Sequence, residues 1–218
     1  MQRSATATIV EAGPEHRDFL AWVCLTAFRS HLERGFWDLM LGGDERKTLQ
    51  YLAALVTTEQ RHWSHYSTFL VAEAGGRPVS ALCGYFEREL GGQSLALAGA
   101  EANRLTERTD EEAADGFARA ASIMTVVPEH AEGAWIVENV ATLPEYRGRG
   151  LCERLMHEVL DRGRALGTTL SDISVFIGND RAQRVYERCG FKVAGEKRDA
   201  GFEAVYGTPG TRTLRREL

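Results

Sequence analysis

The sequence lacks any apolar run near the roughly 18 residues that a membrane-spanning helix needs, so we expect no transmembrane segment. Its 218 residues include only four cysteines, Cys24, Cys83, Cys152 and Cys189. These lie too far apart for a Cys-x-x-Cys metal site and are too few for a disulfide scaffold. We therefore expect four reduced thiols, most of them buried.

An excess of positive charge is also missing. The formal net charge is -5 and the sequence pI is about 5.7, which predicts no nucleic-acid partner. The first six residues carry one positive charge and no apolar stretch follows them, so we expect no secretory signal and a cytoplasmic location. The six histidines show no metal-ligand spacing, and we expect no bound metal.

What is present is an ordinary globular composition, with 44% hydrophobic and 26% charged residues. Hydrophobic periodicity predicts strands and helices in both halves of the chain. In the first half we expect strands over 6–11, 69–72 and 79–85, and helices over 14–28 and 44–61. A turn with the sequence Gly-Gly-Arg-Pro joins the last two of these strands.

A long, acidic, alanine-rich segment occupies residues 87–132. Thr109 and Glu112 have the spacing of a capping box, which predicts a helix from there to about residue 126. We interpret the segment as an insertion within one domain that spans residues 1–218.

The second half alternates between strands and helices. Residues 134–143 are almost continuously apolar, which is typical of a strand buried on both faces. A helix over 151–166, a strand over 173–177 and a helix over 180–189 follow, and two more strands fill 192–218 around a Gly/Pro loop. The pattern predicts an α/β fold.

The loop before the helix at 151–166 contains Arg147, Gly148, Arg149 and Gly150. A helix N-terminus offers free N–H groups and a partial positive charge, and glycines let a phosphate approach the backbone closely. These residues therefore predict a pyrophosphate site.

Three glycine-rich patterns compete for this loop. The P-loop spacing is absent, and the dinucleotide pattern GxGxxG fails because Glu153 stands at its third glycine, which disfavours a dinucleotide oxidoreductase. The pattern Arg-x-x-Gly-x-Gly/Ala fits Arg147 and Gly150, and departs only at Cys152.

Two blocks of the sequence resemble the GCN5-related N-acetyltransferase (GNAT) family. They are Pro-Glu-Tyr-Arg-Gly-Arg-Gly at 144–150 and the segment 179–191, with its Asn-x-x-Ala-x-x-x-Tyr-x-x-x-Gly-Phe spacing. The close resemblance covers about 134–193. It implies a mixed central sheet of about seven strands flanked by helices, and the insertion between strands 3 and 4 departs from the family pattern.

The resemblance also implies acetyl-CoA as the acetyl donor, held where the strands at 134–143 and 173–177 splay apart. Backbone groups there would pair with the pantetheine arm, and one N–H could polarise the thioester. The residues implied in acetyl-CoA binding are Val140, Thr142, Arg147, Gly148, Arg149, Gly150, Leu151, Cys152 and Asn179. Cys152 can be the small residue that packs by the phosphates or, alternatively, a reactive nucleophile.

Two residues are candidates for catalysis. Tyr186 stands at the family's tyrosine position, where it would donate a proton to the leaving thiolate, although it could also be a core tyrosine. Glu138 interrupts an apolar strand, and burial would raise its pKa toward that of a general base. Alternatively, Glu138 orients the acceptor or pairs with an arginine. Strand alternation predicts that Asn139 points to the opposite face.

Residues Glu33, Phe36, Trp37 and Asp38 lie in a predicted loop, which in relatives overhangs the acceptor cleft. Aromatic and acidic side chains could bind a cationic amine, or the loop could be a hydrophobic plug.

We expect an acetyl-CoA-dependent N-acetyltransferase that acts by direct attack of a primary amine in a ternary complex. The acceptor could be a small molecule or a peptide, and a homodimer is possible. The alternative is a non-catalytic acyl-CoA-binding module of the same fold. Because such a module need not keep both Glu138 and Tyr186, their presence favours the enzyme.

Overall fold

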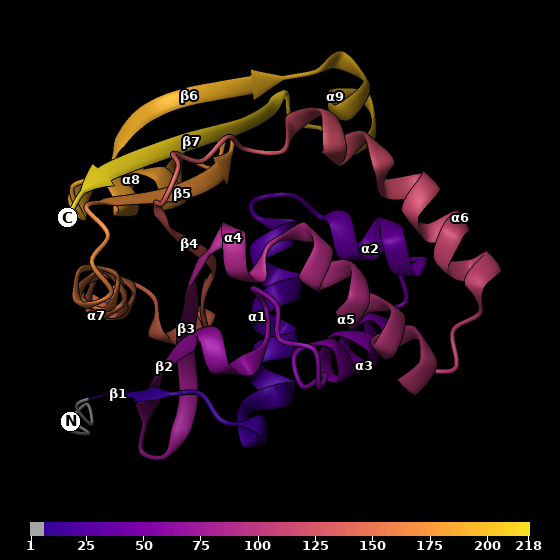
Figure 1. Ribbon diagram of the computed structural model, residues 1–218, viewed down its shortest axis with the longest axis horizontal. Coiled ribbons are helices and arrows are strands. Elements are labelled where there is room, and N and C mark those ends of the chain that lie inside the picture. The colour runs from indigo at the N-terminus through magenta and orange to yellow at the C-terminus, as the bar shows by residue number, and fades with distance from the viewer. Residues whose placement is uncertain (1–6) are drawn as a thin grey trace.

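The computed structural model describes residues 7–218, which form a seven-stranded mixed sheet with helices on both faces (Figure 1). Its spatial order is β1-β2-β3-β4-β5-β7-β6. Within residues 7–218, β4 and β5 are the only strands that pair in parallel. The strands are β1 (Thr8–Glu11), β2 (Phe69–Ala74), β3 (Arg77–Phe86), β4 (Trp135–Thr142), β5 (Leu170–Phe176), β6 (Lys192–Arg198) and β7 (Gly210–Glu217). This confirms the predicted sheet; Thr6, where the first strand was expected to begin, lies outside the described residues.

Helices cover the two faces of the sheet from different parts of the chain. On one face lie α1 (Arg17–Arg29), preceded by the 3₁₀ turn η1 (Pro14–His16), then α2 (Phe36–Leu41) and α3 (Glu45–Leu55). The opposite face is covered by α7 (Leu151–Ala165), with α8 (Asp180–Arg188) beside β5. Figure 1 shows α7 on the other side of β2, β3 and β4 from α1.

Each face buries its own apolar core. Leu20, Leu52 and Phe69 belong to the core under α1 and α3, and Leu155 and Phe191 belong to the core under α7. Helix α7 has its apolar residues at helical spacing toward the sheet and polar residues elsewhere, as an amphipathic helix should.

The insertion forms four short elements: α4 (Glu87–Leu90), α5 (Gly92–Leu105), α6 (Asp110–Ala120) and the 3₁₀ helix η3 (Ala121–Val126). The capping box is confirmed, because Glu112 N donates to Thr109 Oγ1 at 3.1 Å and Thr109 N donates to the Glu112 carboxylate at 2.9 Å. The helix that it opens turns to 3₁₀ after Ala120, and α5 was not predicted.

The predicted helix over 44–61 is too long, because α3 ends at Leu55. Thr57 Oγ1 donates to Ala53 O at 2.9 Å and Thr58 Oγ1 donates to Leu55 O at 3.0 Å. Such hydroxyl bonds offer carbonyls an alternative to the helical N–H. The imidazole of His62 also contacts Leu55 O at 2.9 Å, which holds the following loop against the helix end.

Two further helices lie where loops were predicted. Helix α2 begins at Phe36, so Phe36, Trp37 and Asp38 lie on a helix, with Asp38 accepting from Gly35 N at its start. Helix α9 (Ala200–Tyr206) lies between β6 and β7, and Asp199 caps it by accepting from Phe202 N at 2.7 Å. Both are short helices stabilised by packing and caps, which apolar periodicity detects poorly.

Candidate active site

Strands β4 and β5 are paired over only three residues. Trp135, Ile136 and Val137 of β4 match Ser171, Asp172 and Ile173 of β5. From Glu138 onward β4 keeps its pairing with β3, while β5 continues to Phe176 along β7. The two strands therefore splay after Val137 and Ile173, as the family resemblance implied for this pair of strands. Beyond Glu138 the β4 backbone has no strand partner on that side within the described residues.

Asn139 marks a bulge in β4. Its φ is 52°, and the register with β3 shifts between Ala81 and Cys83. Asn139 Nδ2 donates to Ser64 Oγ at 2.9 Å and lies 3.5 Å from Cys83 Sγ. Glu138 is the register partner of Cys83, which belongs to the core under α1, so its side chain lies on that face. Asn139, next to Cys83 Sγ, lies on the same face. The prediction that Asn139 points to the opposite face from Glu138 is therefore wrong, because the bulge interrupts the alternation.

A cavity of about 1060 Å³ runs from the loop before α7, through the splayed strands, to the space between α1, α2, α3 and the insertion. The structure brings most of the predicted site residues to its wall. These are Phe36, Trp37, Glu138, Val140, Thr142, Arg147, Gly148, Gly150, Leu151, Cys152, Asn179 and Tyr186. Glu33, Asp38 and Arg149 are not among the residues that line it.

The loop at 147–150 needs glycine for its backbone shape. Gly148 and Gly150 have φ of 74° and 73°, and a Cβ on either would meet nothing within 4 Å. Arg147 Nε donates to Thr142 O at 3.0 Å, and the Arg149 guanidinium lies 4.8 Å from the Tyr146 ring centroid. The loop is thereby held against the end of β4, with the first N–H groups of α7 beside it.

Cys152 lies in the first turn of α7. Burial, with the neighbouring Cys189 and Glu153, raises the pKa of its thiol to about 12. A thiol with this pKa stays protonated near neutral pH, which argues against the nucleophile alternative.

Tyr186 lies on α8 and is buried, with its side chain lining the cavity. Burial, with Cys152 and Cys189 nearby, raises the pKa of its hydroxyl well above the usual value. Asn179 begins the same helix; its Oδ1 accepts from Ala182 N at 3.2 Å and its Nδ2 donates to Ser30 Oγ at 2.7 Å. The helix is thus tied to the end of α1.

Glu138 presents a buried carboxylate oxygen to the cavity. Its Oε2 has no hydrogen-bond partner within residues 7–218. Burial raises the pKa of this carboxyl, against the opposing effects of His130 and Tyr85. A carboxyl group with a raised pKa and a free oxygen can accept a proton near neutral pH.

His130 and Asp172 belong to a buried ionic group that sequence reasoning missed. His130 Nδ1 lies 3.7 Å from Asp172 Oδ2, and Arg215 holds both Asp172 oxygens at 2.8 Å. Although burial opposes the charged imidazole, Asp172 and Glu138 raise the pKa of His130. No local sequence signal links these residues, because they come from the insertion, β5 and β7.

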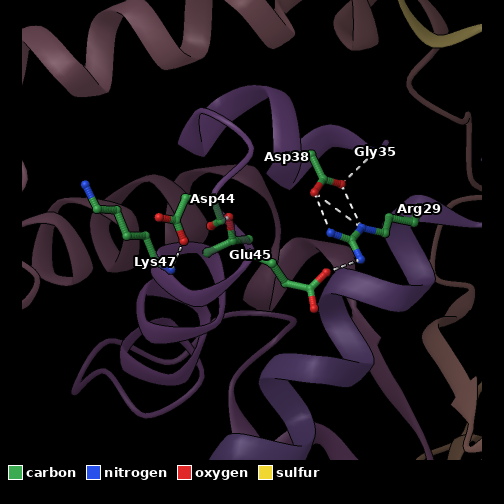
Figure 2. Close-up of polar contacts among 7 residues, drawn as sticks. Arg29, Gly35, Asp38, Asp44, Glu45 and Lys47 are labelled. Atoms are coloured by element: carbon green, nitrogen blue, oxygen red, sulfur yellow. Dashed lines mark hydrogen bonds and ion pairs between the residues drawn. The ribbon is translucent and has the colours of Figure 1, made fainter. Parts of the chain in front are cut away.

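Asp38, expected at the acceptor site, forms contacts within the fold instead (Figure 2). Arg29 Nη2 lies 2.7 Å and Arg29 Nε 3.0 Å from its two oxygens, and Gly35 N donates to it at 2.9 Å. Burial alone would raise the pKa of Asp38, but the Arg29 and Gly35 hydrogen bonds outweigh it and hold the pKa below its usual value. Glu33 is exposed, and neither Glu33 nor Asp38 is among the residues that line the cavity.

Among the described residues, no three His, Cys, Asp or Glu side chains lie close enough together to hold a metal ion. The same part of the chain contains no helix of the length and hydropathy required to span a bilayer. The four cysteines are free.

Solved structures of acetyltransferases share this fold. An N-acetyltransferase from Staphylococcus aureus Mu50 has a TM-score of 0.65 and 21% identity, covering 96% of this chain and all of that one. The protein yncA from Salmonella typhimurium, solved with its cofactor acetyl-CoA, has a TM-score of 0.55 and 15% identity over 98% of this chain and 95% of that one. PaiA N-acetyltransferase from Thermoplasma acidophilum, in complex with coenzyme A, has a TM-score of 0.51 and 12% identity, covering 98% of this chain and 99% of that one.

A search of curated protein sequences finds no match to this chain. The sequence profile of the acetyltransferase (GNAT) family, in contrast, matches residues 36–191, which include the loop before α7, the splayed strands and α8. The chain therefore belongs to the acetyltransferase (GNAT) family.

Proposed function

We propose that this protein transfers acetyl from acetyl-CoA to a primary amine by direct attack in a ternary complex. One observation carries the proposal. A single cavity joins the glycine loop before α7, the opening between β4 and β5, and the side chains of Glu138 and Tyr186. It offers sites for both substrates with an acid and a base between them.

The residues present fit acetyl-CoA. Gly148 and Gly150 leave open space beside the N-terminus of α7, where a pyrophosphate would meet free N–H groups and the positive end of the helix. The β4 backbone around Val140, which has no strand partner on the β5 side, would supply hydrogen bonds for an amide-bearing arm, and Thr142 O there already accepts from Arg147 Nε. When bound, acetyl-CoA supplies an acetyl group activated as a thioester, which an unprotonated amine attacks.

Glu138 would act as the general base. An ammonium ion has no lone pair, so the acceptor must lose a proton before attack. Oε2 has no hydrogen-bond partner among the described residues, and burial raises the pKa of the carboxyl, which makes its carboxylate a stronger base than an exposed one.

Tyr186 would protonate the leaving thiolate. Its hydroxyl makes no hydrogen bond to the described residues and its ring lines the cavity beside Cys152. The hydroxyl is protonated before the reaction, as a proton donor must be, and its raised pKa makes it a weaker acid than an exposed tyrosine.

We also infer that residues 1–218 form one domain, because strands from both ends of the described chain share one sheet. A cytoplasmic location and a homodimer stay predictions.

The proposal is tested by measuring thiol release from acetyl-CoA in the presence of primary amines, with acetyl-CoA binding measured by calorimetry on the same sample. We expect release that depends on an amine. Binding of acetyl-CoA without amine-dependent release would instead identify the non-catalytic module.

A further inference from the structure

The insertion builds one wall of the cavity beyond Glu138. Helix α5 presents a single face to the cavity, with residues at spacings of three and four: Gly92, Leu95, Ala96, Gly99, Ala100 and Asn103. Most of these side chains are small, so the helix encloses space rather than filling it.

The facing wall is aromatic. The ring centroid of Trp37 lies 4.9 Å from that of Phe36, 5.7 Å from that of Phe28 and 6.2 Å from that of Tyr51. All four side chains line the cavity. Phe28 and Phe36, which are half-buried, offer ring faces and edges to an apolar or aromatic ligand, and the buried Trp37 packs against both of them.

Two large apolar side chains of the insertion lie against the same space but are exposed. Phe117 of α6 is 50% exposed and Met124 of η3 is 59% exposed, and both line the cavity. Clustered apolar surface that faces a cavity commonly marks a ligand-binding site. An apolar ligand body would remove these two side chains from water.

The insertion is fixed to the helices across the cavity. Arg108, which lies between α5 and α6, donates from Nη2 to Met40 O at 2.8 Å. Arg119 of α6 donates from Nε to Leu39 O at 3.0 Å, so this part of the insertion is tied to α2. Tyr51 OH donates to Gly99 O at 3.4 Å, which ties α3 to α5. Figure 1 shows α5 lying along α3. The space is therefore walled, which suits a small molecule better than a protein surface.

Polar groups meet this space at its inner end. Glu138 Oε2 and Asn139 Oδ1 are buried without partners among the described residues, and Asn139 is only 5% exposed. Both oxygens accept hydrogen bonds, and the lining also includes the carboxylates of Glu87 and, in the first turn of α7, Glu153. The basic side chains that line the cavity come instead from its coenzyme half and rim: His31, Arg147, Arg181 and Arg188.

We propose that the acceptor is a small primary amine with a bulky apolar body, aromatic or alkyl. Its nitrogen would lie at Glu138 and Asn139, and its body between the aromatic wall and the insertion. This rests on the proposed function and adds the substrate class. Between the aromatic wall and the insertion, a polycation would find carboxylates only at the Glu138 end, since Glu153 lies in the first turn of α7 and pairs with Arg188. It would place its other charges against apolar walls, which is unfavourable.

The test compares kcat/KM for propylamine, butylamine, hexylamine, octylamine and phenethylamine with that for spermidine and ethanolamine. We expect kcat/KM to rise about fourfold per methylene that enters the chamber, because each buried methylene gains transfer free energy. Phenethylamine should exceed both polar amines. A preference for spermidine or ethanolamine would overturn the proposal.

A variant pair tests the chamber itself. Ala100→Trp places a large ring into the cavity from α5, and Leu97→Trp places the same ring on an exposed position of the same helix, 57% exposed and outside the lining. We expect Ala100→Trp to raise KM for octylamine about tenfold or more, with the acetyl-CoA Kd unchanged, and Leu97→Trp to change neither. Circular dichroism and Tm check that both fold. Equal octylamine KM in the two variants would overturn the proposal.

Calorimetry separates failure of this inference from failure of the proposed function. Octylamine and spermidine are titrated into protein saturated with coenzyme A, which cannot turn over. Tighter binding of octylamine, lost in Ala100→Trp, supports the chamber even if no amine releases thiol, and in that case only the transferase function fails. If amines are acetylated but octylamine does not bind better than spermidine, only the chamber assignment fails.

Discussion

Arg29 donates hydrogen bonds to both carboxylate oxygens of Asp38, and Nη1 of the same guanidinium donates to Glu45 Oε2 at 2.8 Å (Figure 2). The two acids differ in burial, since the Asp38 side chain is 4% exposed and that of Glu45 is 61% exposed. The pair links α1 to α2, whose aromatic residues line the cavity. We therefore expect loss of the Arg29–Asp38 pair to lower the stability of the fold rather than the affinity for a substrate.

Asp38→Asn should lower the free energy of unfolding by about 2 kcal/mol at pH 7, because it leaves Arg29 without its buried partner. The folded-state pKa of Asp38 is lowered, so its contribution is present above the unfolded pKa and is lost as pH falls through the folded pKa. Urea unfolding from pH 7 to pH 3 measures this. Glu45→Gln is the control and should cost under about 0.5 kcal/mol, as exposed pairs do; equal losses in the two variants would contradict the assignment.

Glu138→Gln should abolish the acid limb of the rate profile. If Glu138 is the base, wild-type kcat/KM falls as pH drops through its pKa, and the raised pKa moves that limb above the usual range of a glutamate. A limb that persists unchanged in Glu138→Gln would assign the base to another group.

The same substitution has an opposite effect on stability. Because the folded-state pKa of Glu138 is raised, its contribution to stability is complete below the unfolded pKa and is lost as pH rises through the folded pKa. Glu138→Gln should therefore be more stable than wild type at pH 8, with the difference shrinking toward pH 4. Chemical unfolding at both pH values measures it, and a variant less stable at pH 8 would show that the carboxylate has a partner in solution.

Tyr186→Phe should lower kcat about 100-fold or more and leave the Kd of acetyl-CoA nearly unchanged, since only the proton donor is removed. Tyr206→Phe is the matched control, because Tyr206 is also buried but its hydroxyl donates to Ala120 O at 3.0 Å, away from the reaction. Steady-state kinetics measures kcat, and calorimetry measures the Kd of acetyl-CoA. An unchanged kcat in Tyr186→Phe would show that Tyr186 is not the proton donor.

Gly150→Glu should weaken acetyl-CoA binding on the order of 100-fold, because it sets a negative charge where phosphates are expected. The positive φ of Gly150 adds strain for most residues, so Gly150→Asn is the control, as asparagine tolerates this conformation. We expect the asparagine variant to keep most of its affinity by calorimetry. Equal losses would trace the effect to strain, and normal affinity in Gly150→Glu would disprove the pyrophosphate site.

Gly116→Ala tests how the insertion is held. An alanine is normally more favourable than glycine within a helix by about 1 kcal/mol. Here its Cβ would lie 2.1 Å from Met40 O, so α6 must move away from α2. We expect lower stability and faster proteolysis within 106–132, whereas Ala118→Leu, at an exposed position of the same helix, should change neither. Increased stability in Gly116→Ala would show that α6 adapts freely.

The sequence by itself determined the features that depend on near neighbours. The Thr109–Glu112 capping box, the glycines before α7 and the apolar run of β4 each act over a few residues, so their patterns can be interpreted without the fold. The alternation of strand and helix patterns indicated the α/β class, and the two family blocks implied where β4 and β5 splay apart.

Only the tertiary structure decided which side chains meet. The bulge at Asn139 places the side chains of Glu138 and Asn139 on one face of the sheet. Asp38 binds Arg29 and does not line the cavity where the acceptor was expected. The ends of α3 and the presence of α2 and α9 depended on caps and packing, which outweigh weak local propensities. The acceptor chamber could not be predicted because its walls come from α1, α2, α3 and the insertion, and contacts between distant segments leave no periodic signal in one sequence.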